Sequence, residues 1–147
     1  MKGIRRIMIV EDNDDDFEAL SMALEESGSG HTPIIRCSTG KEALEQFDRM
    51  RQSRRPAEES PRLILLDLKL PDMAGSVLLE EIKSDARLRQ IPVIVVTSSS
   101  NNSDVNRCYD NGANSYVRKP LDLDGFSSMV ERLRGFWLET SELPIPV

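Results

Sequence analysis

Short apolar runs alternate with segments of helical periodicity along the chain, and this alternation limits the possible folds more than any other feature. The predicted strands cover residues 5–10, 32–37, 62–67, 92–97 and 114–119. The predicted helices cover residues 14–28, 40–52, 75–86, 102–111 and 122–139, and Gly28 and Gly30 are expected to end the first of them. The third and fourth runs are almost continuously apolar, as parallel strands covered on both faces require.

We therefore predict an α/β fold with a doubly wound, five-stranded open parallel sheet and five helices, since a closed barrel needs eight such units. In the usual strand order, 2-1-3-4-5, the second strand lies at the edge of the sheet. Residues 52–62 are polar and punctuated by prolines, which predicts a solvated loop. Residues 1–139 are expected to form the domain, and residues 140–147 a tail too short for an output domain.

Length, charge and cysteine usage exclude several classes of protein. A chain of 147 residues suits one domain, and its net charge of −6 without clustered basic residues argues against nucleic-acid binding. Its apolar runs are too short for a membrane span, and the run at 7–10 is too short for a signal peptide. Cys37 and Cys108 lack the spacing of a zinc site or a redox pair. We expect free thiols and a cytoplasmic protein.

Polar residues follow the predicted strands at the edge where open α/β sheets place their sites. Glu11 and Asp12 follow the first strand, Asp67 ends the third, Thr97 the fourth and Lys119 the fifth. Each residue alone could be an ordinary turn, cap or surface residue. Asp67 ends the apolar run LILLD, where burial of an unpartnered carboxylate would cost several kcal/mol. The convergence of all five residues favours a reactive site.

Three carboxylates at one edge require cations. Two of them about 4 Å apart repel by about 4 kcal/mol at an effective dielectric constant of about 20. Oxygen ligands of this kind suit Mg²⁺, and Lys119 would add a further positive charge. Mg²⁺, an ammonium group and the hydroxyl of Thr97 together match the needs of phosphoryl transfer, with Asp67 as the nucleophile.

The segments IMIVEDN, LILLDLKLPDMAG, VIVVTSS and SYVRKP resemble, in order and spacing, the four signature segments of response-regulator receiver domains. The resemblance covers residues 4–138 and implies a flavodoxin-like fold. It further implies that Asp67 accepts a phosphoryl group from a histidine kinase. Glu11, Asp12, Asp67 and the backbone carbonyl of Lys69 would bind Mg²⁺. Such a protein is a phosphoacceptor that assists its own phosphorylation and dephosphorylation rather than a conventional enzyme.

The same resemblance assigns roles to the other residues of the site. Thr97 and Lys119 would each contact a phosphoryl oxygen, and Tyr116 would be the aromatic switch residue. Lys69 and Ser99 would tune hydrolysis of the phosphoryl group, and we expect the long cationic Lys69 to slow it. In this family the bond before Pro120 is commonly cis. The output surface would comprise the predicted helix at 102–111, the fifth strand and the last helix.

The segment GFWLETSELP (135–144) resembles the C-terminal segment of response regulators that partner phytochromes, as does the long 52–62 connection. Phe136, Trp137 and Leu138 are successive apolar residues that cannot all face inward, so we hypothesise a homodimer through them. Their alternative role is to pack on their own sheet. A phosphatase of the haloacid-dehalogenase type would need an acid at position 69, where this chain has lysine. A receiver-like binding module that works without phosphorylation is the remaining alternative.

Overall fold

The computed structural model describes residues 6–25 and 32–145. Within them, five parallel strands form one sheet in the order β2-β1-β3-β4-β5, which confirms the predicted fold class. The strands are β1 (Ile7–Val10), β2 (Ile34–Cys37), β3 (Leu63–Leu66), β4 (Val93–Thr97) and β5 (Ser115–Arg118). The helices are α1 (Asp14–Glu25), α2 (Gly40–Gln52), α3 (Pro56–Glu59), α4 (Gly75–Ser84), α5 (Asn102–Asp110), α6 (Leu123–Arg134) and the π-helical η1 (Gly135–Thr140).

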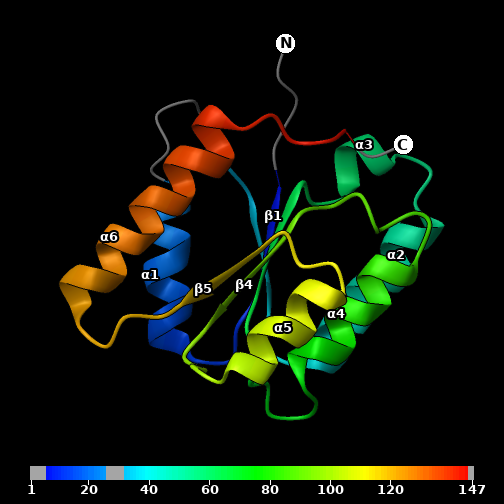
Figure 1. The fold of residues 1–147 in the computed structure, drawn as a ribbon. Helices are drawn as coiled ribbons and strands as arrows, with labels where there is room; N and C mark the ends of the chain where they lie inside the picture. The colour runs from blue at the N-terminus through cyan, green and yellow to red at the C-terminus, as the bar shows by residue number, and fades with distance from the viewer. Residues whose placement is uncertain (1–5, 26–31, 146–147) are drawn as a thin grey trace.

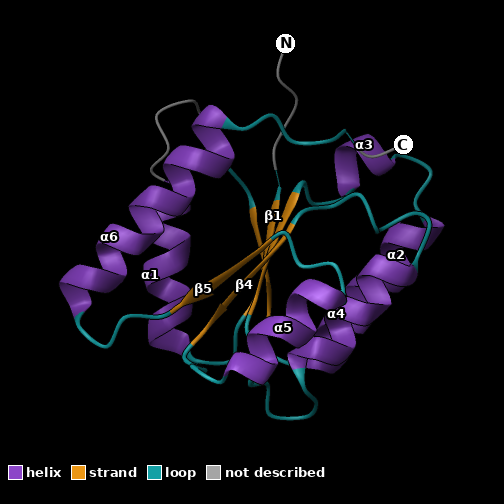
Figure 2. Ribbon diagram, in the orientation of Figure 1, coloured by secondary structure: helices purple, strands orange, loops and turns teal. Residues whose placement is uncertain are grey.

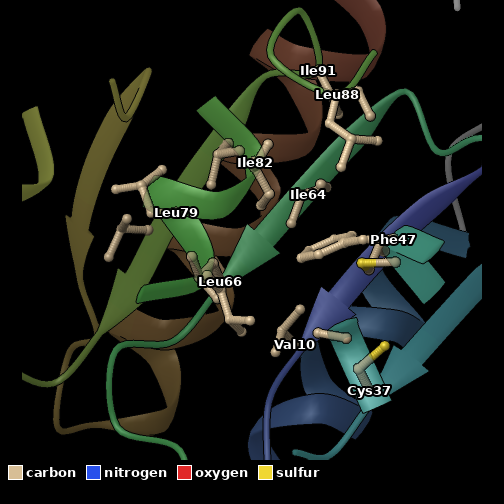
Figure 3. Packing of buried hydrophobic residues seen from close by; sticks show 14 of the residues in the cluster. Val10, Cys37, Phe47, Ile64, Leu66, Leu79, Ile82, Leu88 and Ile91 are labelled. Atoms are coloured by element: carbon tan, nitrogen blue, oxygen red, sulfur yellow. The ribbon is translucent and has the colours of Figure 1, made fainter. Parts of the chain in front are cut away.

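The helices cover the sheet on both faces. Helices α1 and α6 lie on one face, and α2, α4 and α5 lie on the other (Figures 1 and 2). Alternate residues of each central strand point to opposite faces. Val10, Ile64 and Leu66 join the cluster under α2 and α4 (Figure 3), whereas Ile9 and Leu65 join the cluster under α1 and α6. Burial on both faces explains the continuous apolar runs in the sequence.

The structure departs from the sequence prediction in three respects. A short helix, α3, forms within the predicted loop, because Pro56 occupies the first helical position, where its ring favours the helical backbone and no N–H is needed. The predicted last helix divides into α6 and the wider η1. The strands begin one or two residues later than predicted, and two of them end one residue earlier. The predicted helix end at Gly28 and Gly30 lies outside the described residues.

The segment after η1 runs back across the amino-terminal end of the sheet towards α3 (Figure 1). Leu143 of this segment packs against the cluster under α1 and α6, so the predicted tail is in contact with the domain. In the described parts of the chain, no helix is long and apolar enough to cross a membrane.

Candidate functional site

The register of the sheet brings Glu11 and Asp67 together. Val10 of β1 pairs with Leu66 of β3, so the residues that follow them leave adjacent strands at the same level. The backbone N–H of Asp67 donates to the carbonyl of Val10 at 3.0 Å, which continues the ladder by one bond. Glu11 and Asp67 are buried, with only 2% and 6% of their surface exposed.

Lys119 reaches this pair from the end of β5. The Lys119 N–H donates to the carbonyl of Thr97 at 2.8 Å, which fixes the backbone of Lys119 beside β4. Its ammonium group lies 2.9 Å from Asp67 Oδ2, 2.5 Å from Glu11 Oε1 and 2.9 Å from Asp16 Oδ2. The Lys119 side chain is 10% exposed, so these ion pairs form largely away from water.

The three ion pairs and the burial set the charge of the site. Burial alone would raise the pKa of Asp67, but the hydrogen bond and charge of Lys119 outweigh it and lower that pKa. Burial raises the pKa of Glu11 to about 7, although its hydrogen bond with Lys119 acts in the opposite direction. Glu11 and Asp67 share one ammonium group, and the more deeply buried Glu11 is the better place for a proton. Asp67 is therefore held as a carboxylate.

Glu11, Asp12 and Asp67 could together hold a metal ion. One oxygen from each carboxylate lies within 4.8 Å of the others, and Asp12 is exposed while its two partners are buried. An all-oxygen set of carboxylates that is open to solvent on one side suits a hard divalent cation with retained waters. The donor set therefore fits Mg²⁺ or Mn²⁺.

Thr97, Ser99 and Tyr116 form a connected group beside Asp67. Thr97 is fully buried, and a hydrogen bond from its hydroxyl contributes to the lowered pKa of Asp67. The Ser99 N–H points to Thr97 Oγ1 at 3.5 Å, and the Tyr116 hydroxyl donates to the carbonyl of Ser99 at 3.0 Å. Ser99 also donates through its own hydroxyl to Asp104 of α5 at 2.5 Å.

Lys69 lies in the loop that follows β3, with its backbone close to the site and its side chain exposed. Its N–H donates to Asp67 Oδ1 at 3.1 Å, and its ammonium group lies 3.4 Å from the hydroxyl of Ser98. Gly75 closes the same loop against the backbone of Asp67, where an added Cβ would lie 2.2 Å from the Asp67 carbonyl oxygen. The loop therefore requires glycine at this position.

The structure places the predicted dimer residues away from this site and in different surroundings. Phe136 is 54% exposed, Trp137 is half-buried and Leu138 is buried at 3% exposure. The rings of Phe136 and Trp137 meet edge to face at a centroid distance of 5.1 Å. Leu138 belongs to the cluster under α1 and α6. Phe136 and Trp137 are thus the members of this trio available to another molecule.

Asp16 is a member of the site that sequence reasoning missed. The sequence did hold a signal for it, because Asp16 precedes the inward-facing Leu20 by one helical repeat of four residues. One expectation about the backbone is wrong. Among the described residues no peptide bond is cis, so the bond before Pro120 is trans.

Comparisons with known proteins agree with this geometry. The sequence profile of the "Response regulator receiver domain" matches residues 7–131. The response regulator Rcp1 of Synechocystis sp. is 39% identical over 94% of this chain and 92% of its own length. The "Probable methanogenesis regulatory protein FilR2" of Methanothrix harundinacea is 38% identical over 95% of this chain and 88% of its own length.

Two solved structures share the fold closely. The Mn²⁺-bound form of Rcp1 superimposes with a TM-score of 0.86 at 36% identity, and covers 95% of this chain and 99% of the other. The phosphorylated cyanobacterial phytochrome response regulator RcpA gives a TM-score of 0.84 at 36% identity, and covers 97% and 99%.

Proposed function

The chain belongs to the response regulator receiver family, and from this membership we propose that Asp67 accepts a phosphoryl group from the phosphohistidine of a histidine kinase. The observation that supports this most is the ion pair of Asp67. Its carboxylate is buried, held ionised by Lys119 at 2.9 Å, and adjacent to Glu11 and Asp12. An ionised carboxylate at the edge of a site is the form required of a nucleophile.

In the proposed reaction, one Asp67 oxygen attacks the phosphorus atom while the phosphorus–nitrogen bond to histidine breaks. The electron pair of that bond leaves with the imidazole, and an acyl phosphate forms on Asp67. Lys119 would turn one N–H from the carboxylate to a phosphoryl oxygen, and the buried Thr97 hydroxyl would donate to another. When bound at Glu11, Asp12 and Asp67, Mg²⁺ would supply positive charge that offsets the charge of the phosphoryl oxygens. The Lys69 carbonyl is a further proposed ligand.

Phosphorylation would be read out through Thr97, Ser99 and Tyr116. A phosphoryl group adds a charge of about −1.5 to −2 at Asp67, and this charge would pull the Thr97 hydroxyl towards it. Thr97 is linked through the Ser99 backbone to the Tyr116 hydroxyl, so a shift of the 97–99 segment reaches β5 and α5. Only Cys108 of α5 is buried, which suits a helix that shifts easily. The proposed output surface comprises α5, β5 and α6.

The partner of that surface is proposed to include a second copy of the chain. Phe136, Trp137 and Leu133 line a groove with Val117 and Met129, between β5 and the end of α6. Phe136 is 54% exposed, which supports association through it. The homodimer is tested by sedimentation velocity at tens of micromolar protein, where an exclusively monomeric protein would contradict it.

We propose a phytochrome-type histidine kinase as the phosphoryl donor. RcpA is described as a cyanobacterial phytochrome response regulator, which supports this choice, whereas FilR2 is described as a regulator of methanogenesis. Leu121 and Leu123 are almost fully exposed next to Lys119 and offer apolar contact surface to a kinase. Purified phytochrome kinases, labelled with radioactive phosphate in red and in far-red light, test the pairing. Absence of transfer from any of them would reject this donor without affecting the role of Asp67.

The role of Asp67 is tested with acetyl phosphate, which needs no kinase. Wild-type protein with Mg²⁺ is expected to gain the mass of one phosphoryl group, and to gain it far more slowly after chelation of the metal. Asp67→Asn is expected to gain none. A wild type that stays unmodified, or undiminished labelling of Asp67→Asn, would reject the proposal. The first result would favour the alternative of a receiver-like module that binds without phosphorylation.

The proposal includes a cytoplasmic location. Cys37 and Cys108 are both buried free thiols, as expected in a reducing compartment.

A further inference from the structure

Lys119 uses all three of its N–H donors within the site. A lysine ammonium group has three donors, and those of Lys119 go to Glu11, Asp16 and Asp67. Two of these acceptors, Glu11 and Asp67, also belong to the carboxylate group that could hold a cation. Asp16 does not belong to that group. Asp16 is therefore the acceptor of Lys119 that a bound cation leaves untouched.

The local structure of α1 directs Asp16 towards Lys119. Asn13 accepts the Asp16 N–H through its side-chain oxygen at 2.9 Å, as an N-cap residue does, and so fixes the first turn. Asp16 lies four residues before Leu20 and eight before Leu24, both 1% exposed, so it shares their inward face. Its side chain is 32% exposed and its Oδ2 lies 2.9 Å from the Lys119 nitrogen.

We infer that Asp16 is a positioning residue that holds the Lys119 ammonium group at Asp67 throughout phosphorylation. The inference rests on the proposed phosphoacceptor function. When a cation binds, Glu11 and Asp67 share their charge with it, which weakens their hold on Lys119. When the acyl phosphate forms, Asp67 loses its own negative charge. Asp16 keeps both its charge and its contact in every one of these states, and so limits the movement of Lys119.

The kinetic test compares Asp16→Ala with Asp15→Ala. Both changes remove one carboxylate from the first turn of α1, so net charge and the interaction with the helix end change alike. Asp15 is exposed, whereas Asp16 pairs with Lys119. At saturating Mg²⁺, phosphorylation by acetyl phosphate is expected to slow by about three- to tenfold in Asp16→Ala and by less than about twofold in Asp15→Ala.

The Mg²⁺ dependence separates positioning from simple attraction of the cation. If Asp16 only attracted Mg²⁺, Asp16→Ala would be slow at low Mg²⁺ concentration but would reach the wild-type rate at saturating Mg²⁺, and this result would overturn the inference. Equal slowing in Asp15→Ala would overturn it as well. If circular dichroism shows that Asp16→Ala is unfolded, Asp16→Asn replaces it in the comparison with Asp15→Ala, because asparagine preserves the shape of the side chain and removes its charge.

A second measurement needs no phosphorylation. In protein with nitrogen-15-labelled lysine, the Lys119 ammonium protons are expected to exchange slowly with water, because Glu11, Asp16 and Asp67 accept hydrogen bonds from all three. Asp16→Ala is expected to accelerate this exchange by about tenfold or more, and Asp15→Ala to leave it unchanged. Unchanged exchange in Asp16→Ala would reject the inference even if wild type is phosphorylated. Exchange could instead be accelerated in Asp16→Ala while acetyl phosphate fails to modify the wild type. This result would reject the proposed function but would still show that Asp16 holds the Lys119 ammonium group.

Discussion

The Tyr116 hydroxyl donates a hydrogen bond to the backbone carbonyl of Ser99 at 3.0 Å, across the gap between β5 and the loop that follows β4. Ser99 lies two residues after Thr97, whose hydroxyl contacts Asp67. The ring of Tyr116 packs against the core cluster under α2 and α4. Its side chain therefore faces inward and links the loop after β4, beside the site, to β5.

Removal of this hydroxyl tests its contribution to the fold. Tyr116→Phe keeps the ring and is expected to lower the free energy of unfolding by about 0.5–1.5 kcal/mol, the usual net value of one hydrogen bond. Urea denaturation measures the change. The matched control is Tyr109→Phe, which removes an exposed hydroxyl that accepts the Tyr116 N–H at 3.2 Å. A larger loss in Tyr109→Phe would contradict the structural role assigned to the Tyr116 hydroxyl.

Truncation of Leu138 to alanine is predicted to lower the free energy of unfolding more than truncation of Phe136. Leu138 is 3% exposed, so Leu138→Ala is expected to destabilise the fold by about 2–5 kcal/mol through loss of packing and creation of a cavity. Phe136 is 54% exposed and its ring meets that of Trp137 edge to face, so Phe136→Ala is expected to cost at most about 1.5 kcal/mol. Thermal unfolding measures both. In sedimentation, Phe136→Ala should weaken any dimer, and a dimer of unchanged affinity would exclude Phe136 from the interface.

The sequence predicted the sheet and most of the site because both follow from the apolar runs. Each run ends at the same edge of a parallel sheet, so Glu11, Asp67 and Lys119 could be placed together without coordinates. Asp16 was not predicted as a site residue, because it is one of three consecutive aspartates in a helix. The position of the sheet edge alone does not identify which of the three faces Lys119. The burial of Leu138 could not be predicted either, since it depends on the wider π-helical turn that ends the last helix.

The buried thiol of Cys37 is expected to make the folded protein less stable at alkaline pH. Burial, with the nearby charges of Glu42 and Glu45, raises the pKa of Cys37 to about 12. An unfolded cysteine has a pKa of about 8.5, so above that pH the folded chain binds more protons at this position than the unfolded chain. The contribution of the protonated Cys37 thiol to the free energy of unfolding is therefore fully present below about pH 8.5, and it is lost as the pH rises towards 12.

Urea denaturation between pH 8 and pH 11 measures this loss against Cys37→Ala. The wild type is expected to lose more stability per pH unit than the variant, by up to about 1.4 kcal/mol for one group. Other titrating groups contribute equally to both proteins and cancel in the comparison. Identical slopes would show that the Cys37 thiolate forms as easily in the folded protein as in the unfolded chain.

Lys69 is expected to lengthen the life of the phosphoryl group on Asp67. Its side chain is exposed, and its ammonium group lies 3.4 Å from the Ser98 hydroxyl, at the open side of the site. From there it could shield the acyl phosphate from water or pair with a phosphoryl oxygen. Lys69→Ala is predicted to shorten the lifetime by about two- to fivefold, because an exposed ion pair contributes about 0.2–1 kcal/mol.

Loss of the phosphoryl mass with time, after removal of acetyl phosphate, measures that lifetime. Lys69→Met keeps the length of the side chain without its charge, so it separates the two explanations. A short lifetime in both variants would assign the effect to charge, whereas a short lifetime in Lys69→Ala alone would assign it to exclusion of water. A lifetime in Lys69→Ala equal to or longer than that of wild type would show that Lys69 does not protect the phosphoryl group.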